Sequence, residues 1–312
     1  MKRTYFILTL VLAFFLNACT TKKQDSKNNE LPTIETAYLG QKPPGLVPEL
    51  FAPGIVSING RHEGAVSFSP NLDEVYFSAS EKDEDPNIYF SKLEGKKWTT
   101  PKKANFTKGK KLGEMHPFVN PKGDRIYFAA HDGFTLPHQK ESVKIWYVNR
   151  LENSWSEAIQ LDSPVNDGFG FYPNQAKNGD LYYFNISKRK TYYAPIKNGK
   201  FSEVHEVAIE GVHAFISPTQ DYIVANARNR DDVQRKSDIY AYFKEKDGTW
   251  SKAINLGNAV NSNVSEVAPT ITPDGKYLFF GRDEEDGRKN IYWVSTEVIH
   301  KLRPNDLNAF NN

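Results

Sequence analysis

Five segments of this sequence share one pattern, and no other feature limits its possible folds as strongly. The clearest copy has a Thr-Pro-Asp-Gly turn ending at Gly275, an aromatic run from Tyr277 to Phe280 and a second run from Asn290 to Trp293. The first positions of the five copies, which recur at intervals of 41 to 56 residues, are Glu63, Glu114, Gly170, Gly211 and Glu266. Such spacing holds four short strands, which form one blade of a β-propeller. The repeat therefore predicts an all-β fold, a single propeller of five four-stranded blades.

A short closing element ends each of the first four copies, and these elements contain Trp98, Trp155, Phe201 and Trp250. The fifth copy has no such element after Val294, but a strand-like segment, residues 47–52, precedes the first copy. We therefore expect this N-terminal segment to complete the last blade, which closes the ring and hides strand edges. The alternative is an ordinary N-terminal extension that lies across the surface.

The first strand of each copy is expected to face the central channel. Pro117, Pro173 and Pro269 occupy equivalent positions in this strand. Proline has no backbone N–H to give to a neighbouring strand, so it belongs on an edge strand. The innermost strand of a blade is such an edge, and its side chains are those that a ligand in the channel would meet.

The N-terminus predicts export and a lipid anchor. Lys2 and Arg3 precede an apolar run, residues 5–16, which has the length of a signal-peptide core rather than of a membrane span. Small residues before Cys19, the one cysteine of the chain, resemble a lipoprotein cleavage site in which this cysteine is lipidated. Thr20 follows where an aspartate would signal retention in the inner membrane, which favours the outer membrane. The alternative is an ordinary signal peptide with an incidental cysteine.

These features divide the chain into four parts. We expect a signal peptide at residues 1–18, a flexible polar tether at 19–45, the propeller at 46–302 and a C-terminal tail at 303–312. The net charge is only +2 and no long basic block occurs, which argues against a nucleic-acid partner. With one cysteine, no disulfide can form within the chain.

The Pro-Asp-Gly turn, the Tyr277–Phe280 strand and the Asn290–Tyr292 strand resemble the WD40-like repeat of the TolB-type β-propellers. The resemblance spans residues 46–302 and is weaker in the third and fourth copies, where turn residues are lost. Lipoproteins of the bacterial envelope with one tethered propeller are similar in organisation. The resemblance implies the fold and an envelope location but little about function, since propellers host both binding and catalysis.

One position of the repeat, the start of the innermost strand, holds Glu63, Glu114 and Glu266. In a ring, these carboxylates would converge near one mouth of the channel. Two residues further along, the second, third and fourth copies carry His116, Tyr172 and His213. Such a mouth could bind a metal, a sugar or a basic peptide. The glutamates also fit a structural role between blades because they belong to the repeat, whereas the two histidines and the tyrosine do not.

No cofactor is expected, and the ligands of any metal are unknown. Calcium remains open because acidic loops occur at residues 81–85 and 283–286, although neither has EF-hand spacing. No nucleophile elbow, zinc-protease motif or phosphate-binding glycine loop is present. The leading hypothesis is a non-enzymatic envelope lipoprotein that binds a ligand, a protein or an oligosaccharide through the propeller mouth. The alternatives are a carbohydrate-active hydrolase or lyase that uses the channel carboxylates, and a scaffold of an envelope complex.

Overall fold

The computed structural model describes residues 37–82, 84–133, 142–228 and 237–304. Contacts divide the chain into two units, Met1–Glu30 and Leu31–Asn312, of which the first lies wholly outside the described residues. The expected signal peptide and the lipidation site Cys19 therefore fall outside the described part. All that follows concerns the second unit.

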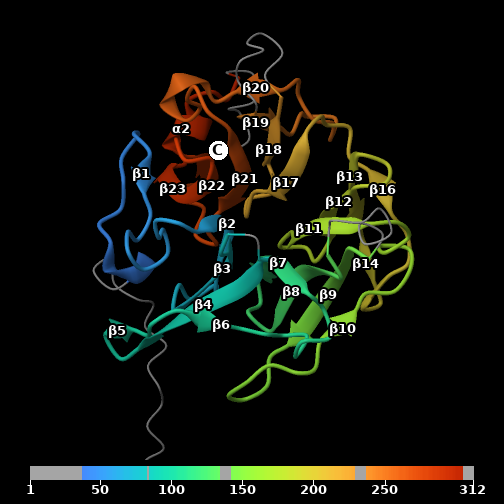
Figure 1. Cartoon of the computed structure of the whole chain (residues 1–312). Helices are drawn as coiled ribbons and strands as arrows, with labels where there is room; N and C mark the ends of the chain where they lie inside the picture. Colours follow the sequence, from blue (N-terminus) through green and yellow to red (C-terminus); the bar gives the residue numbers. More distant parts are fainter. Residues whose placement is uncertain (1–36, 83, 134–141, 229–236, 305–312) are drawn as a thin grey trace, which may run out of the picture. The chain divides into compact units, whose positions relative to one another are not determined.

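The second unit is built from five antiparallel sheets, one for each copy of the repeat (Figure 1). The first three blades comprise β2 (His62–Phe68), β3 (Glu74–Ser80), β4 (Asn87–Glu94) and β6 (Lys102–Lys103); β7 (Gly113–Val119), β8 (Arg125–His131), β9 (Lys144–Asn149) and β10 (Ile159–Gln160); and β11 (Gly170–Gln175), β12 (Leu181–Asn185), β13 (Lys190–Ala194) and β16 (His205–Glu206). The last two comprise β17 (Val212–Ile216), β18 (Tyr222–Ala227), β19 (Asp238–Phe243) and β20 (Ile254–Asn255); and β21 (Glu266–Ile271), β22 (Tyr277–Asp283), β23 (Lys289–Ser295) and β1 (Glu49–Leu50). The five-bladed propeller predicted from the repeat is confirmed.

Six short elements of the described residues lie outside this four-strand pattern. They are η1 (Tyr38–Gly40), β5 (Lys97–Trp98), the hairpin of β14 (Ile196–Lys197) and β15 (Lys200–Phe201), η2 (Gly257–Ala259) and α2 (Glu297–His300). Residues Val298 and Ile299 of α2 are buried and join the core beside the fifth blade.

The second strand of a blade is buried on both faces because neighbouring blades cover it from either side. In β3, Tyr76 packs with Phe106 and Phe128 of the second blade, whereas the adjacent Phe77 joins the cluster that contains Phe279 and Trp293 of the fifth blade. Successive side chains on a strand point to opposite faces, so one aromatic pair serves two interfaces. The aromatic runs of the repeat are therefore the contacts that hold blade to blade.

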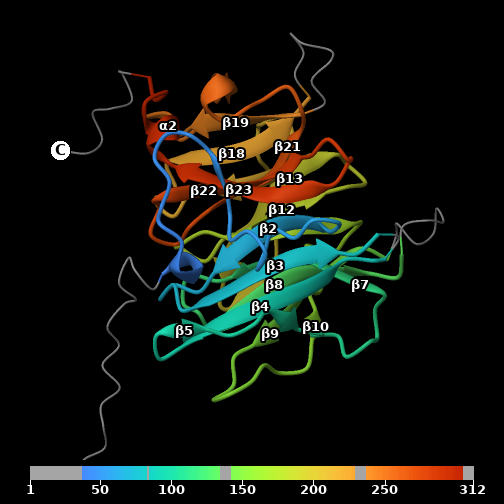
Figure 2. The same ribbon diagram turned by 60° about the vertical axis from the view of Figure 1, so that its left-hand side comes forward.

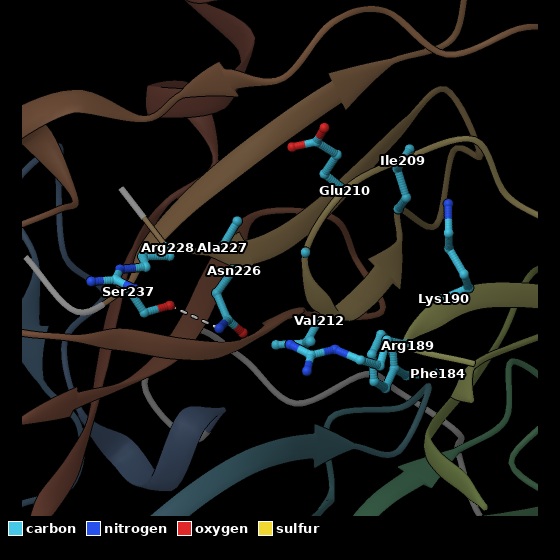
Figure 3. A pocket seen from close by; sticks show the side chains of 11 residues that line it. Phe184, Arg189, Lys190, Ile209, Glu210, Val212, Asn226, Ala227, Arg228 and Ser237 are labelled. Atoms are coloured by element: carbon cyan, nitrogen blue, oxygen red, sulfur yellow. Dashed lines mark hydrogen bonds between the residues drawn. The ribbon is translucent and has the colours of Figure 1, made fainter. Parts of the chain in front are cut away.

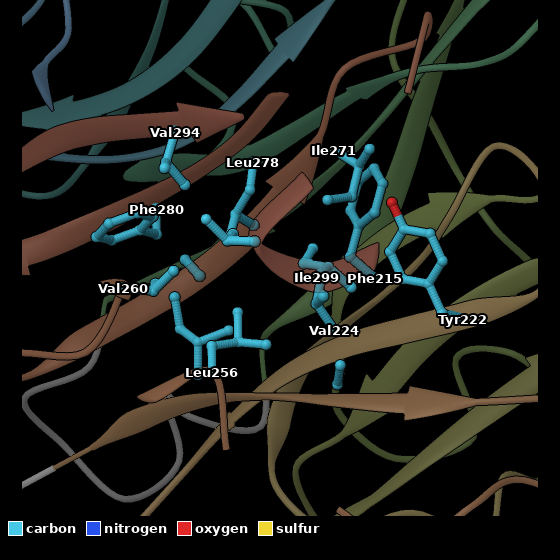
Figure 4. Packing of buried hydrophobic residues seen from close by; sticks show 14 of the residues in the cluster. Phe215, Tyr222, Val224, Leu256, Val260, Ile271, Leu278, Phe280, Val294 and Ile299 are labelled. Carbon is cyan, nitrogen blue, oxygen red and sulfur yellow. The ribbon is translucent and has the colours of Figure 1, made fainter. Parts of the chain in front are cut away.

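The largest apolar cluster lies between the fourth and fifth blades (Figure 4). Val224 of β18 and Leu278 of β22 are fully buried there, together with Leu256 and Val260 from the connection between the two blades. Ile299 of α2 packs against the same cluster. The C-terminal helix thus covers the seam between these two blades.

The ring is closed by the N-terminal strand, as the missing closing element predicted. Strand β1 pairs antiparallel with β23, with Glu49 opposite Trp293 and Leu50 opposite Tyr292. The backbone N–H of Phe51 continues this pairing with a hydrogen bond of 2.8 Å to the carbonyl of Ile291. Figures 1 and 2 show the blue N-terminal segment lying beside the red strands of the last blade.

The expected tether is too long at its C-terminal end. Residues 37–45 are packed against the propeller, and Tyr38 is only 2% exposed. Its hydroxyl donates a hydrogen bond of 2.8 Å to Asp274, and its ring contacts Tyr277 and Trp293 edge-on or tilted at 5.1 and 5.5 Å between centroids. Gln41 bonds to the backbone of Leu50 and Ala52, and the carbonyl of Gly45 accepts the N–H of Ser295. These contacts hold the polar segment to the fifth blade, so the segment belongs to the propeller.

Candidate functional site

The innermost strands share a backbone distortion at the middle of the channel. In each of the five, the pairing register with the second strand shifts at one point. The residue at the shift has a left-handed backbone, and these residues are Ala65, His116, Tyr172, His213 and Ala268, with φ between 44° and 55°. Non-glycine residues rarely adopt this conformation, and it costs about 1–2 kcal/mol each. A β-bulge of this kind redirects a side chain, here at the same level in every blade.

The three large side chains at this level meet one another. The ring centroids of His116 and Tyr172 lie 5.1 Å apart, those of His116 and His213 5.6 Å, and those of Tyr172 and His213 4.8 Å. The hydroxyl of Tyr172 donates a hydrogen bond of 3.0 Å to the carbonyl of Pro269, on the fifth blade. The side chains that the sequence singled out as non-repeat residues are therefore brought together, as a packed layer inside the channel.

Both histidines in this layer are held in the neutral form. Asn226 Oδ1 accepts the backbone N–H of Ala268 at 3.2 Å and lies 2.7 Å from His213 Nδ1, so the imidazole is the donor in that pair. Burial lowers the pKa of His213 to about 4. Burial also lowers the pKa of His116 well below its usual value, and His116 Nδ1 has no hydrogen-bond partner among the described residues. Neutral imidazoles and a phenol suit contact with uncharged groups rather than with anions.

The three glutamates are not part of this layer, because each is bound by the loop that leads into its own blade. Glu63 Oε1 accepts the backbone N–H of Ile58, and Glu114 accepts those of Phe106 and Thr107 at 3.1 and 2.6 Å. Glu266 accepts both the backbone N–H and the hydroxyl of Ser262 at 3.1 and 2.6 Å. The carboxylates satisfy loop amides inside the propeller wall, a role that fits residues belonging to the repeat.

Two of these carboxylates also face an arginine. Glu63 Oε1 lies 2.8 Å from Arg61 Nε, and Glu266 Oε1 lies 2.9 Å from Arg282 Nε. Burial raises the pKa of Glu63 to about 7 in spite of this arginine, and burial also raises the pKa of Glu266. A general acid would need a raised pKa in a deep pocket away from Lys and Arg. Glu63 and Glu266 both lie beside an arginine, so neither is placed as a general acid would be.

A cavity of about 600 Å³ opens at the end of the channel where the turns between first and second strands lie. All five blades contribute to it, and its deeper wall includes Phe118, Phe215 and Ile271. The rings of Phe118 and Phe215 meet edge-on, with their centroids 5.7 Å apart. The rim consists of turn residues, among them Pro70, Pro121, Lys122, Lys177, Pro218 and Pro273. We call this cavity the mouth pocket.

The sequence predicted a site at the channel mouth where the innermost strands begin, whereas the mouth pocket lies where these strands end. Phe118 and Phe215 lie two residues beyond His116 and His213, so alternation along the strand places them at the next level of the channel. Pro121 and Pro273 were visible as turn residues only. The sequence did contain one signal for this pocket: the second and fourth copies have Phe118 and Phe215 at the position where the fifth copy has Thr270.

The acidic loop at residues 283–286 contains two ion pairs. Asp283 lies 2.9 Å from Lys289 Nζ, and Asp286 lies 3.4 Å from Arg288. Within the described ranges, no group of three or more His, Cys, Asp or Glu side chains is arranged to hold a metal ion. None of the helices in this described part is long and apolar enough to cross a membrane.

Comparison with known proteins gives matches to solved structures only. No protein-family model matches the sequence, and no curated protein matches it. The chain is similar to an α-L-arabinofuranosidase from Lactobacillus brevis, with 14% identity, coverage of 78% of this chain and 91% of that one, and a TM-score of 0.53. It also matches TolB from Acinetobacter baumannii (13% identity, 74% of this chain, TM-score 0.45) and a putative TolB from Agrobacterium tumefaciens (15% identity, 72% of this chain and 71% of that one, TM-score 0.47).

These similarities concern the fold. TolB proteins are among the solved structures that the chain matches. The chain spans 56% of the length of the Acinetobacter protein. At identities of 13–15%, a shared propeller says nothing about a shared substrate.

Proposed function

We propose that this protein is a non-enzymatic binding protein of the cell envelope that holds a ligand or a segment of a protein partner in the mouth pocket. One observation carries the proposal: a cavity of about 600 Å³ lies on the propeller axis and is lined by all five blades. Sites for small molecules and peptides are concave, mostly apolar and few in each protein, and this cavity has those properties.

The walls of the mouth pocket indicate what it would accept. Phe118, Phe215 and Ile271 offer an apolar surface, while Lys122 and Lys177 stand at the rim. Behind it, His116 and Tyr172 fill the channel, so an occupant would end there rather than pass through. An apolar group with an acidic neighbour would match this combination, because burial of the apolar part gives affinity and the lysines favour the charge.

The envelope location belongs to the proposal as well. It is supported by the signal-like N-terminus and by Cys19 at the expected cleavage site, both of which lie outside the described residues. Replacement of Cys19 by alanine should abolish incorporation of radioactive palmitate and release the protein from membranes. Palmitate labelling of the variant at the wild-type level would contradict the anchor.

Two other functions were expected as alternatives. A hydrolase or lyase would need carboxylates in the channel, whereas Glu63, Glu114 and Glu266 are engaged by loop amides. A scaffold would present an apolar patch, and the exposed large apolar residues of the described part come from several separate segments: Leu46, Val47, Ile55, Ile58, Leu112, Leu151, Ile159 and Ile196. The binding function therefore has the stronger support.

A fluorescent probe of the mouth pocket tests the proposal. Anilinonaphthalene sulfonate carries an apolar ring system and one negative charge, and it should bind the folded protein saturably at one site. Thr219→Trp, at the exposed rim, should block entry and weaken binding by tenfold or more. Thr249→Trp is the matched control, since Thr249 is exposed and, like Thr219, bonds a nearby aspartate.

Equal binding by the two variants would refute the mouth pocket as the site. A panel of chromogenic glycosides should show no turnover above that of buffer. Turnover that a Glu63→Gln, Glu114→Gln or Glu266→Gln change abolishes would instead support the hydrolase.

A further inference from the structure

A second pocket, of about 380 Å³, lies between the third and fourth blades and shares no lining residue with the mouth pocket. Its walls come from the end of β12, the turn into β13, the loop before β17 and the end of β18. Figure 3 shows Arg189 and Lys190 on one side of this pocket and Arg228 and Ser237 on the other. We call it the arginine pocket.

The two arginines of this pocket differ from the others in the chain. Six of the eight arginines that the structure describes have a hydrogen-bonded or ion-paired partner, and these are Arg61, Arg125, Arg150, Arg282, Arg288 and Arg303. Within the described ranges, Arg189 and Arg228 have neither. The guanidinium groups of both residues line one cavity.

Other charges in the arginine pocket do not cancel these two. Lys190 Nζ pairs with Glu206 at 2.9 Å, and Glu210, which also lines the pocket, interacts electrostatically with the same lysine. Among the described residues, Lys190 is thus paired with carboxylates, whereas Arg189 and Arg228 are not. Planar guanidinium groups bind carboxylate, phosphate and sulfate through paired N–H donors.

The backbone at Arg189 is a second, independent sign. This residue has φ of 54°, a left-handed conformation in the turn between β12 and β13. In the corresponding turn of the fifth blade, the left-handed residue is Gly287, with φ of 78°. A glycine would fit the position of Arg189 without strain, so the arginine holds a backbone conformation that its side chain disfavours.

The rest of the pocket can complete a binding site. The hydroxyl of Ser237 accepts a hydrogen bond of 2.9 Å from Asn226, which leaves its own proton to donate to a ligand. Phe184, Ile209 and Val212 supply apolar surface beside the charges. A volume of about 380 Å³ falls in the range of small-ligand sites, roughly 300–1,000 Å³.

We propose that the arginine pocket binds the oxyanion of a sugar-sized organic ligand between Arg189 and Arg228. The carboxylate, phosphate or sulfate would lie against the guanidinium groups and the Ser237 hydroxyl. The body of the ligand would cover Phe184 and Val212. This site is separate from the mouth pocket and does not depend on what the mouth pocket holds.

Calorimetric titration of the full-length protein at low ionic strength tests the proposal with glucuronate, glucose 6-phosphate, glucose and inorganic phosphate. The two sugar anions should bind saturably, glucose should not, and inorganic phosphate should bind more weakly than glucose 6-phosphate. Arg189→Gly and Arg228→Gln should each weaken binding by about ten- to a hundredfold. Arg288→Gln, in the corresponding turn of the fifth blade, should leave binding unchanged.

The stability of Arg189→Gly separates binding from a structural role. Because glycine relieves the left-handed backbone, this variant should melt at or above the wild-type temperature while it loses the ligand. Binding of the sugar anions no tighter than that of glucose would overturn the proposal, and so would wild-type affinity in both arginine variants. Equal affinity for inorganic phosphate and glucose 6-phosphate would overturn the role of the apolar surface.

Discussion

Replacement of Phe51 by alanine tests how much the N-terminal segment stabilises the propeller. Phe51 follows β1 directly and is fully buried. Its ring lies 4.8 Å from that of Phe279, 5.2 Å from that of Trp293 and 6.2 Å from that of Phe68, measured between centroids. The ring therefore joins the strand that closes the fifth blade to the first blade.

The expected cost follows from those contacts. Truncation of a buried phenylalanine to alanine destabilises a protein by about 3–5 kcal/mol, and aromatic pairs each add roughly 0.5–1.5 kcal/mol beyond area burial. With three aromatic neighbours, we expect a loss near the upper end, about 4–5 kcal/mol. The whole free energy of unfolding of a domain is about 5–15 kcal/mol, so the variant would lose roughly a quarter of it or more.

Urea unfolding followed by tryptophan fluorescence measures this loss. The midpoint should fall while the slope stays that of the wild type, because the surface exposed on unfolding hardly changes. Val47→Ala is the control, since Val47 lies in the same segment but is 72% exposed, and it should change stability by less than about 0.5 kcal/mol. A loss below about 1 kcal/mol for Phe51→Ala at an unchanged slope would refute the reasoning.

Three further changes test the interior. Burial raises the pKa of Glu63 to about 7, so the wild-type protein should lose about 1–3 kcal/mol of its free energy of unfolding as pH rises from 4.5 to 7 and the protonated form disappears. Glu63→Gln should not show this loss. The same change of urea-derived stability with pH in both proteins would contradict this. His213→Gln should act oppositely: burial lowers the pKa to about 4, so wild-type stability falls as pH drops from 6.5, and the variant should retain more of it at pH 5; a parallel decline would be the contrary result. Tyr172→Phe leaves the Pro269 carbonyl without its donor and should cost about 1–3 kcal/mol in thermal unfolding, and an unchanged midpoint would show that this bond contributes nothing.

The fold was predictable because the spacing and the turn residues of the repeat indicate where each strand of a blade begins and ends. The turn at Gly275, the aromatic strand after it and the absent closing element together determine strand order and ring closure. The end of the tether was less predictable, since a polar segment with one aromatic residue gives no periodic signal. The contacts of Tyr38 with the fifth blade, together with the hydrogen bonds of Gln41 and Gly45, show that this segment is packed.

The site was predictable in part. His116, Tyr172 and His213 depart in residue type from the other copies but occupy equivalent positions of the repeat, and their rings meet inside the channel. The sequence could not predict that the glutamate side chains bind loop amides, because the amides that bind Glu114 belong to a loop outside the repeat pattern. The arginine pocket joins residues of two blades, and nothing in the spacing of Arg189 and Arg228 announces that they share a cavity.

The way the ring closes also determines how the molecule would respond to mechanical tension. A pull on the chain ahead of Tyr38 is transmitted to the fifth blade through that side chain and through β1, although the next strand in sequence belongs to the first blade. Strand β1 has only two residues, so its pairing with β23 is the shortest link along that path. Tension would therefore pull β1 away from β23, and so open the ring at the fifth blade, before it separated the longer strands of any blade.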